Sequence, residues 1–259
     1  MNDALSDIEI LRPDWDLPVQ AGFTTRPGGA SLPPYDALNL ALHVDDDPAR
    51  VRENRRRLVS QAGLPEQPRW VAQVHGMRVV HADEVERDVT EADAVWTDQP
   101  GEVCAVLVAD CLPVLLADPA GGCVAAVHAG WRGLAAGILQ QTLATLPVAA
   151  RDLAACIGPC IGSEAYEVGP DVIESIKRRD IQPVHHPSRR ARDRFQLDLA
   201  ATARDMLASA GVADIRRFAH CTHRDPARFF SYRRDGVTGR IAGYIACEPN
   251  GPGPHGMRR

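Results

Sequence analysis

The strongest constraint on the fold comes from two apolar runs joined by a short turn. They lie in residues 109–133, ADCLPVLLADPAGGCVAAVHAGWRG. Asp118-Pro119-Ala120-Gly121 has the composition of a tight turn, with proline suited to the second position and glycine to the fourth. The runs are therefore predicted to pair as an antiparallel hairpin. If Asp118 pairs with Gly121, Cys111 lies directly opposite His128, with Cβ atoms about 4.5–5.5 Å apart. A bulge at Gly121-Gly122 would shift this register.

Cys111 and His128 have three interpretations: a buried thiol near a core histidine, a nucleophile with its base, or two ligands of one metal. After His128 the chain enters a helix through AGWRG, and the first N–H groups of a helix can hold an anion. A third ligand candidate is His75 in QVHG, which ends a predicted strand. Two histidines and one cysteine would hold zinc and leave a position for water or substrate, which is typical of a catalytic site.

The rest of the chain mixes helix and strand patterns. DDDPARVRENRRRLVSQAGL predicts a helix that Asp46 or Asp47 caps, that has Pro48 in its first turn and that ends at Gly63; its arginines are expected to form a solvated face. Three further helices are predicted for GLAAGILQQTLATL, GPDVIESIKRRD and QLDLAATARDMLASAG. Strands are predicted for EVCAVLVAD, for two short stretches around His75-Gly76 in RWVAQVHGMRVVHAD, and for two stretches around a glycine-containing turn in FFSYRRDGVTGRIAGYIA.

These elements do not alternate as regular βαβ units. We therefore expect an α+β, or mixed α/β, fold in which mixed β-sheets pack as a sandwich with flanking helices. Residues 21–247 are predicted to form a single domain, because the motifs are spread through them without a linker. Residues 1–20 lead into this domain, and residues 248–259, EPNGPGPHGMRR, are predicted to be a disordered tail.

Composition excludes several classes of partner. With Lys+Arg 29 against Asp+Glu 34, the net charge of -5 provides no overall positive field for nucleic acid or an anionic membrane. An anionic ligand therefore needs a local site. The sequence has no apolar run of about 18 residues, and it begins with acidic residues where a signal peptide has a basic end. We expect a cytoplasmic protein whose seven cysteines are reduced thiols or metal ligands.

Eight motifs, in order from about Phe23 to about Ile245, resemble the YfiH-like family: TTRPGGAS, PYDALNLALHVDDD, QVHG, EADAVWTD, ADCLPVLLAD, AAVHAGWRGLAAGIL, CIGPCIGSEAYEVG and FFSYRRDGVTGRIAGYIA. Members have been called multicopper polyphenol oxidases, laccase-domain proteins and purine nucleoside phosphorylases. The resemblance implies zinc bound by His75, Cys111 and His128. It also implies phosphorolysis of adenosine, inosine, guanosine and methylthioadenosine, with adenosine deamination as a companion activity. Bacterial relatives have further been assigned an editing role on peptidoglycan precursors.

The number of histidines argues against copper oxidase chemistry. A multicopper oxidase takes about ten histidines, typically in His-x-His pairs, for its trinuclear cluster and its electron-transfer site. This chain has nine histidines and no His-x-His. We therefore expect zinc as the native metal, with any copper binding adventitious.

Phosphorolysis needs groups for phosphate, ribose and the leaving purine. The candidates for substrate and phosphate are Arg26 in TTRPGG, Asn39 and Arg132, and the candidate for proton transfer is His43. Asp93 and Asp110 are candidates for orienting the zinc-bound imidazoles. Each of these residues also has a plain structural interpretation, as a salt-bridge or hydrogen-bonding partner.

Deamination would use zinc-activated water, but the His-x-Glu and Pro-Cys-x-x-Cys signature is absent, so its acid–base residue stays unassigned. Cys156 and Cys160 have the wrong spacing for Cys-x-x-Cys and mark a strand end. His220 and His223 would face opposite sides of a strand, which weakens a metal role. Tyr232, Arg233 and Arg234 are candidates for lining a pocket or an interface, although such residues are also ordinary in a hairpin. The alternatives are a Cys–His amidase editing peptidoglycan precursors, and a non-catalytic protein braced by zinc. The oligomeric state is left open.

Overall fold

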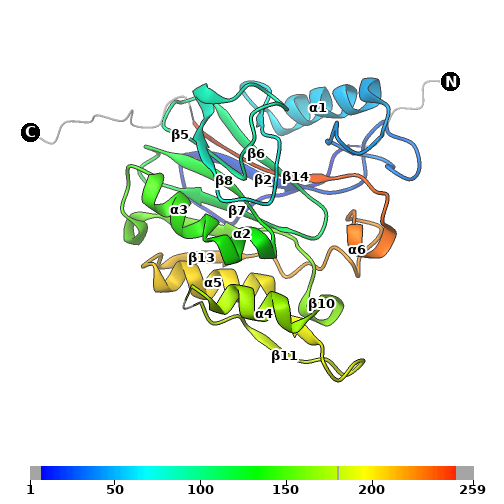
Figure 1. Cartoon of the computed structure of the whole chain (residues 1–259). Helices are drawn as coiled ribbons and strands as arrows, with labels where there is room; N and C mark the ends of the chain where they lie inside the picture. Colours follow the sequence, from blue (N-terminus) through cyan, green and yellow to red (C-terminus); the bar gives the residue numbers. More distant parts are fainter. Residues whose placement is uncertain (1–6, 180, 249–259) are drawn as a thin grey trace, which may run out of the picture.

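The computed structural model describes residues 7–179 and 181–248 as one mixed α/β domain built in layers (Figure 1). A helix, α1 (Pro48–Ala62), covers a five-stranded sheet, which packs against a six-stranded sheet. The other face of the six-stranded sheet is covered by α3 (Ile138–Thr145), α5 (Leu199–Ser209), α2 (Trp131–Ala136) and α4 (Pro170–Lys177). The predicted sandwich of mixed sheets with flanking helices is confirmed.

Both large sheets are mixed. The five-stranded sheet has the order β1 (Ile10–Leu11), β2 (Val19–Thr24), β14 (Ile241–Cys247), β6 (Val103–Val108) and β3 (Arg69–Trp70), with only β3 and β6 parallel. The six-stranded sheet has the order β13 (Asp214–Arg217), β9 (Ala154–Ile157), β7 (Leu112–Ala117), β8 (Val124–Ala129), β5 (Ala94–Thr97) and β4 (Val79–His81). Its outer pairs, β13 with β9 and β5 with β4, are parallel.

A small antiparallel sheet lies beside α4. It consists of β10 (Glu167–Val168), β12 (Phe195–Leu197) and β11 (His185–Pro187). The described part of the N-terminal segment adds β1 to the five-stranded sheet. Of the predicted tail, only Glu248 lies within the described residues, and its N–H donates to the Pro18 carbonyl.

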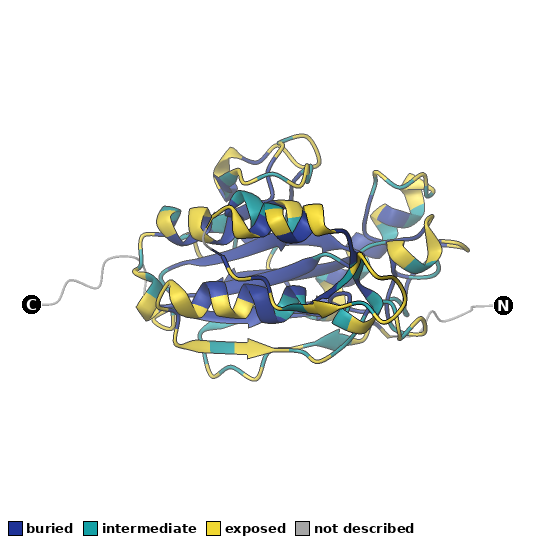
Figure 2. Cartoon of the chain, turned by 60° about the horizontal axis from the view of Figure 1, so that its bottom comes forward, coloured by how far each residue is buried: buried dark blue, intermediate teal, exposed yellow. Residues whose placement is uncertain are grey.

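The two strands of the central hairpin are apolar on both faces because both faces are buried. Along β7, Leu115 packs between the two sheets, whereas Val114 and Leu116 pack against the helices. Figure 2 shows buried strands behind a layer of helices whose outer faces are exposed. Period-two alternation of hydrophobic and polar residues is therefore lost here, and the continuous apolar runs are the expected signature of strands covered on both sides.

The hairpin forms, but the register predicted from a two-residue turn is wrong. Ala117 pairs with Val124, and Asp118 N–H donates to the Cys123 carbonyl at 2.9 Å, so the loop is two residues longer. The Asp118 carboxylate stabilises this longer loop by accepting from two backbone N–H groups within it. As a result Pro113, not Cys111, lies opposite His128.

The predicted helix at residues 48–62 is confirmed with its caps. Asp47 accepts from Ala49 N–H, and Gly63 ends the helix in the left-handed conformation with φ 69°. One of its arginines contradicts the predicted solvated face, because Arg55 is buried. It donates to both carboxylate oxygens of Asp88 and lies over the Trp70 ring.

Three further predictions need correction. The stretch predicted as one helix, residues 133–146, lies in two helices, because Gly137, with φ 93°, interrupts the pattern. The strands on either side of His75-Gly76 exist, but β3 and β4 belong to different sheets. The predicted C-terminal hairpin is wrong: its first half is the short helix α6 (Tyr232–Asp235), seen at the right of Figure 1, and only β14 is a strand. A Ser231 hydroxyl that accepts from Arg234 N–H starts that helix.

None of the helices in the described part of the chain combines the length and the apolar composition that a bilayer crossing requires.

Candidate active site

His75, Cys111 and His128 come together, although they lie far apart in the sequence. Their ligand atoms lie within 4.8 Å of one another, and Cys111 Sγ lies 3.8 Å from His75 Nε2. A tetrahedral zinc ion with Zn–S of about 2.3 Å and Zn–N of about 2.0–2.1 Å would place sulfur and nitrogen about 3.6 Å apart. The three side chains therefore fit a zinc ion. His128 is buried, whereas His75 is exposed, so the group is open to solvent on one side.

Each ligand is supplied by a different part of the fold. His128 lies in β8, and Cys111 lies in the tight connection from β6 to β7, directly after Asp110, whose φ is 93°. His75, with φ 60°, lies in the loop that crosses from β3 to β4 and hence from one sheet to the other. The sandwich thus places all three ligands at one end of its two sheets.

Gly130 leaves room for this group. A Cβ atom at this position would lie 2.9 Å from Cys111 Sγ and 3.3 Å from His75 Cδ2. Since the φ of Gly130 is -67°, which any residue adopts, its backbone does not require glycine. The absence of a side chain is instead required by the close approach of the thiol.

Asp93 orients two of the three candidate ligands. Its fully buried carboxylate lies 2.7 Å from His128 Nδ1 and accepts from the backbone N–H groups of His75 and Gly76. This contact leaves Nε2 of His128 for the metal, as in the carboxylate–histidine–metal arrangement of many zinc sites.

Asp110 has a different environment from the one predicted, because it contacts neither imidazole. Its carboxylate accepts from the hydroxyls of Thr222 and Ser231 and from Arg233 N–H at 2.7 Å. Asp110 therefore attaches α6 to the β6–β7 connection that carries Cys111.

The electrostatics of the group favour a thiolate. Burial alone would raise the pKa of Cys111, but the adjacent His128 and hydrogen bonds from both histidines lower it to about 6. Burial alone would lower the pKa of His128, whereas Cys111 and Asp93 raise it to about 9. Other cysteines behave as core residues: burial raises the pKa of Cys123 to about 12 and that of Cys156 to about 12. Cys111 is thus distinguished by its charged neighbours.

A cavity of about 470 Å³ lies beside the three ligands. Besides them, its lining includes His43, Trp131, Arg132, Tyr166, Tyr232, Arg233 and Arg240. No described carboxylate forms an ion pair with Arg132, Arg233 or Arg240. The aromatic side chains can contact a flat base, and the guanidinium groups make the cavity locally positive in a protein whose net charge is -5.

His43 lines the same cavity. Burial, and next the positive charge of Arg240, lower its pKa, so its imidazole is uncharged at neutral pH. A neutral imidazole has one ring nitrogen that donates and one that accepts, which allows it to exchange a proton with a ligand.

Arg26 and Asn39, predicted to contact substrate or phosphate, are outside this lining. The Arg26 guanidinium binds the carboxylate and the carbonyl of Asp36 and lies over the Phe230 ring, so it is committed to holding two loops together. Asn39 is fully buried, and its Oδ1 accepts from the N–H groups of Ala41 and Arg240. Both side chains thus bind framework groups around the cavity and lie outside its lining.

Arg240 and Tyr166 also line the cavity, although neither is among the site residues predicted from the sequence. The only signal for Arg240 is its place directly before the apolar strand β14, which is a weak one. His220 packs beside the rings of Phe218 and Phe229, and among the described residues the His75, Cys111 and His128 group is the only candidate for a metal site.

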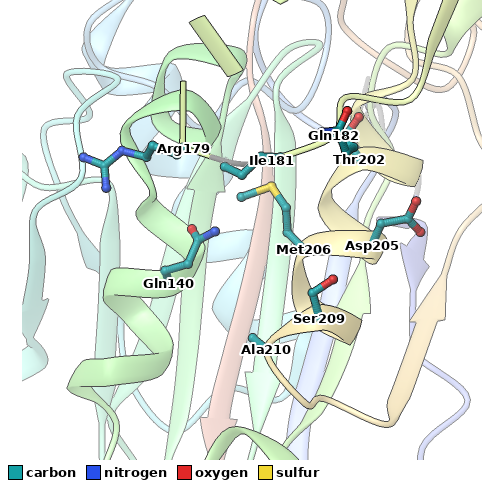
Figure 3. Close-up of a pocket in the computed structure, with 9 residues that line it drawn as sticks. All are labelled: Gln140, Arg179, Ile181, Gln182, Thr202, Asp205, Met206, Ser209 and Ala210. Carbon is teal, nitrogen blue, oxygen red and sulfur yellow. The ribbon is translucent and has the colours of Figure 1, made fainter. Parts of the chain in front are cut away.

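Another cavity, of about 340 Å³, lies on the helical side between α3 and α5 (Figure 3). Its lining combines Gln140, Arg179, Asp205 and Ser209 around Met206 and Ile181, and it contains no histidine or cysteine. The histidine and cysteine side chains suited to zinc chemistry belong instead to the cavity beside Cys111.

Comparisons with known proteins cover nearly the whole chain. The family model described as "Multi-copper polyphenol oxidoreductase laccase" matches residues 20–248. The chain is 44% identical to "Purine nucleoside phosphorylase YfiH" of Shigella flexneri, over 92% of this chain and 98% of that one. It is 46% identical to "Purine nucleoside phosphorylase PA4543" of Pseudomonas aeruginosa, over 91% and 97% of the two chains. The crystal structure of Neisseria meningitidis protein NMB0706 superposes with a TM-score of 0.85 at 40% identity, covering 94% of this chain and 100% of that one.

Proposed function

The chain belongs to the multi-copper polyphenol oxidoreductase laccase family, and from this membership we propose that it is a zinc-containing purine nucleoside phosphorylase. Its substrates in this proposal are adenosine, inosine, guanosine and methylthioadenosine, each with phosphate. The observation that carries the proposal is the His75, Cys111 and His128 group beside a cavity with three guanidinium groups that have no described carboxylate partner.

Phosphorolysis requires groups in the cavity that bind phosphate, contact the base and stabilise the leaving purine. A phosphate oxygen forms a bond to C1′ of the ribose while the C1′–N9 bond breaks, and the electron pair leaves with the purine. The guanidinium groups balance the charge of the phosphate, and the rings of Trp131, Tyr166 and Tyr232 offer surfaces for the base. His43 can hold or donate a proton at its ring nitrogens as charge develops on the purine.

His75, Cys111 and His128 would hold the zinc, with Asp93 orienting His128. When bound, zinc supplies Lewis-acid chemistry at the coordination position that the three protein ligands leave open. The same position would serve adenosine deamination, which we propose as a companion activity. The donor set of one thiolate and two imidazoles suits zinc, and one group of three ligands is too small for a four-copper centre.

A second candidate function is a Cys–His hydrolase acting on peptidoglycan precursors. The observation that favours it is the pKa of about 6 for Cys111 beside a His128 whose pKa is about 9, since this combination yields a thiolate–imidazolium pair. Zinc binding at Cys111 would distinguish the two candidate functions. A thiolate bound to the metal is a poor nucleophile, so bound zinc argues against the Cys–His hydrolase.

The test is product analysis of the purified protein with adenosine or inosine, in the presence and absence of phosphate. Free purine and ribose 1-phosphate should form only with phosphate, and inosine formed from adenosine without phosphate would report deamination. Cys111→Ala should lose metal and turnover together, whereas Cys123→Ala, which removes a buried thiol outside the site, should keep both. A zinc-loaded protein that cleaves no nucleoside would contradict the proposal and direct assays to cell-wall precursors.

A further inference from the structure

Arg240 stands directly before β14 and lines the cavity beside the candidate metal ligands. We propose that the Nε–Nη2 edge of its guanidinium is the phosphate-binding element of the site, and that Asn39 is the residue that positions it. This inference rests on the proposed function, which requires phosphate, and narrows the phosphate site from three arginines to one.

The hydrogen bonds of Arg240 leave one edge of its guanidinium for a ligand. Nη1 donates to the carbonyls of Thr238 at 2.7 Å and Gly239 at 3.0 Å, which uses both of its hydrogens. The Nε–H and the two Nη2 hydrogens have no acceptor among the described residues. This is the edge that binds two oxygens of an oxyanion in parallel, so it is available for a phosphate.

The partial burial of Arg240 also favours an anionic ligand beside it. The side chain is half-buried, and burial lowers its pKa, although the negative charges of Cys111 and Asp110 act in the opposite direction. The carboxylate of Asp110 is already occupied by Thr222, Ser231 and the N–H of Arg233. A partly desolvated cation without a bonded counter-ion is costly, and a bound phosphate would remove that cost.

Asn39 holds the backbone of Arg240 in place. Its Oδ1 accepts from Arg240 N–H at 3.0 Å and from Ala41 N–H, while its Nδ2 donates to the Ala41 carbonyl and to Asp46. The Leu40 N–H also donates to the Arg240 carbonyl. Asn39 is fully buried and uses both ends of its amide, so it fixes Arg240 without touching the ligand itself.

The other two arginines of the cavity are less suited to fix phosphate. Arg132 and Arg233 are both exposed. All three guanidinium groups lie over a ring, Arg132 over Trp131, Arg233 over Tyr166 and Arg240 over Tyr232, so exposure is what distinguishes them. Exposed cations attract anions toward a cavity, but solvent screens each contact strongly. We therefore assign them to attracting phosphate and Arg240 to holding it.

The test measures binding of inorganic phosphate to the protein as purified, by ³¹P NMR titration, together with the phosphate and nucleoside KM values. Arg240→Gln should weaken phosphate binding roughly 30-fold, because a bidentate charged contact is lost. Arg240→Lys, which keeps the charge but not the planar fork, should recover part of this loss. Arg233→Gln is the matched control and should change phosphate binding by less than about 3-fold.

Two further readouts separate this role from a general structural one. In Arg240→Gln, zinc content measured by plasma mass spectrometry and the nucleoside KM should stay close to those of the unaltered protein. Asn39→Ala should raise the phosphate KM, as Arg240→Lys does, while the metal content stays unchanged. If Asn39→Ala does not fold, the comparison of the glutamine and lysine variants at position 240 still decides the proposal.

The inference is overturned if Arg240→Gln binds phosphate as tightly as the unaltered protein, or if Arg233→Gln loses phosphate to the same extent. Absence of phosphate binding to the unaltered protein at millimolar concentration overturns it as well. Phosphate binding that depends on Arg240 in a protein that cleaves no nucleoside would leave the subsite standing and reject the phosphorylase proposal.

Discussion

The carboxylate of Asp93 lies 2.7 Å from Nδ1 of His128. The same carboxylate accepts from the backbone N–H groups of His75 and Gly76, so a single buried side chain positions two candidate metal ligands that come from different elements. These contacts outweigh burial and lower the pKa of Asp93, which therefore stays ionised at neutral pH.

Asp93→Asn should weaken zinc binding by about 10–100-fold, because the amide neither supplies the negative charge nor orients His128 as firmly. Zinc affinity measured by competition with a chromophoric chelator checks this. The matched control is Asp83→Asn, which removes the carboxylate from another His–Asp contact, that of Asp83 with His81 at 2.6 Å, in an exposed position. Equal zinc affinity in Asp93→Asn and the unaltered protein would show that Asp93 only supports the fold.

The thiol of Cys111 should react with iodoacetamide at unusually low pH once the metal has been removed by chelation. Its pKa of about 6 means that the thiolate fraction rises through pH 6 and is nearly complete at neutral pH, whereas an ordinary cysteine, with a pKa of about 8.5, is mostly protonated there. The rate of Cys111 modification, followed by mass spectrometry, should therefore have its midpoint near pH 6.

Cys123 provides an internal control in the same experiment, because burial raises its pKa to about 12 and it should stay unlabelled. Zinc-loaded protein should be labelled at Cys111 more slowly than chelated protein. A rate that rises only above about pH 8 would contradict the pairing of Cys111 with His128.

Gly130→Ala should reduce metal occupancy without a large loss of stability. The added Cβ would stand 2.9 Å from Cys111 Sγ, while the backbone at position 130 is compatible with alanine. Metal content and the thermal midpoint of unfolding are the measurements. Gly76→Ala is the matched control, since its Cβ would meet its nearest neighbour at an ordinary 3.5 Å. Full zinc occupancy in Gly130→Ala would mean that Cys111 has room to move.

Arg55→Ala should destabilise the protein by about 3 kcal/mol, because it leaves Asp88 without its bidentate partner and uncovers the Trp70 ring. Urea unfolding measures this difference in the free energy of unfolding. The neighbouring Arg56→Ala removes only an exposed ion pair with Glu53 and should change it by less than about 0.5 kcal/mol. Equal effects of the two substitutions would refute the buried role of Arg55.

Local patterns were sufficient for the elements whose determinants lie within a few residues. The helix at Pro48–Ala62 carries its own start and stop signals in Asp47 and Gly63, and the buried strands of the hairpin are apolar along their whole length. The sequence also determined the three candidate ligands, because their motifs match a known family. Patterns failed where a distant partner decides the structure, as at α6, where the carboxylate of Asp110 binds a backbone N–H group of the helix.

Only the tertiary structure decided what surrounds those ligands. His75 and Arg240 have no local signal for their positions, because a loop that crosses between two sheets brings in the first and hydrogen bonds to Asn39 hold the second. The different outcomes for Arg26 and Arg240 have the same origin: Asp36 takes the charge of one arginine, whereas no described carboxylate takes the charge of the other. Periodicity and capping act over a few residues, but the partner of a charge is chosen by packing between segments about 200 residues apart in the chain, as Arg240 and Asn39 are.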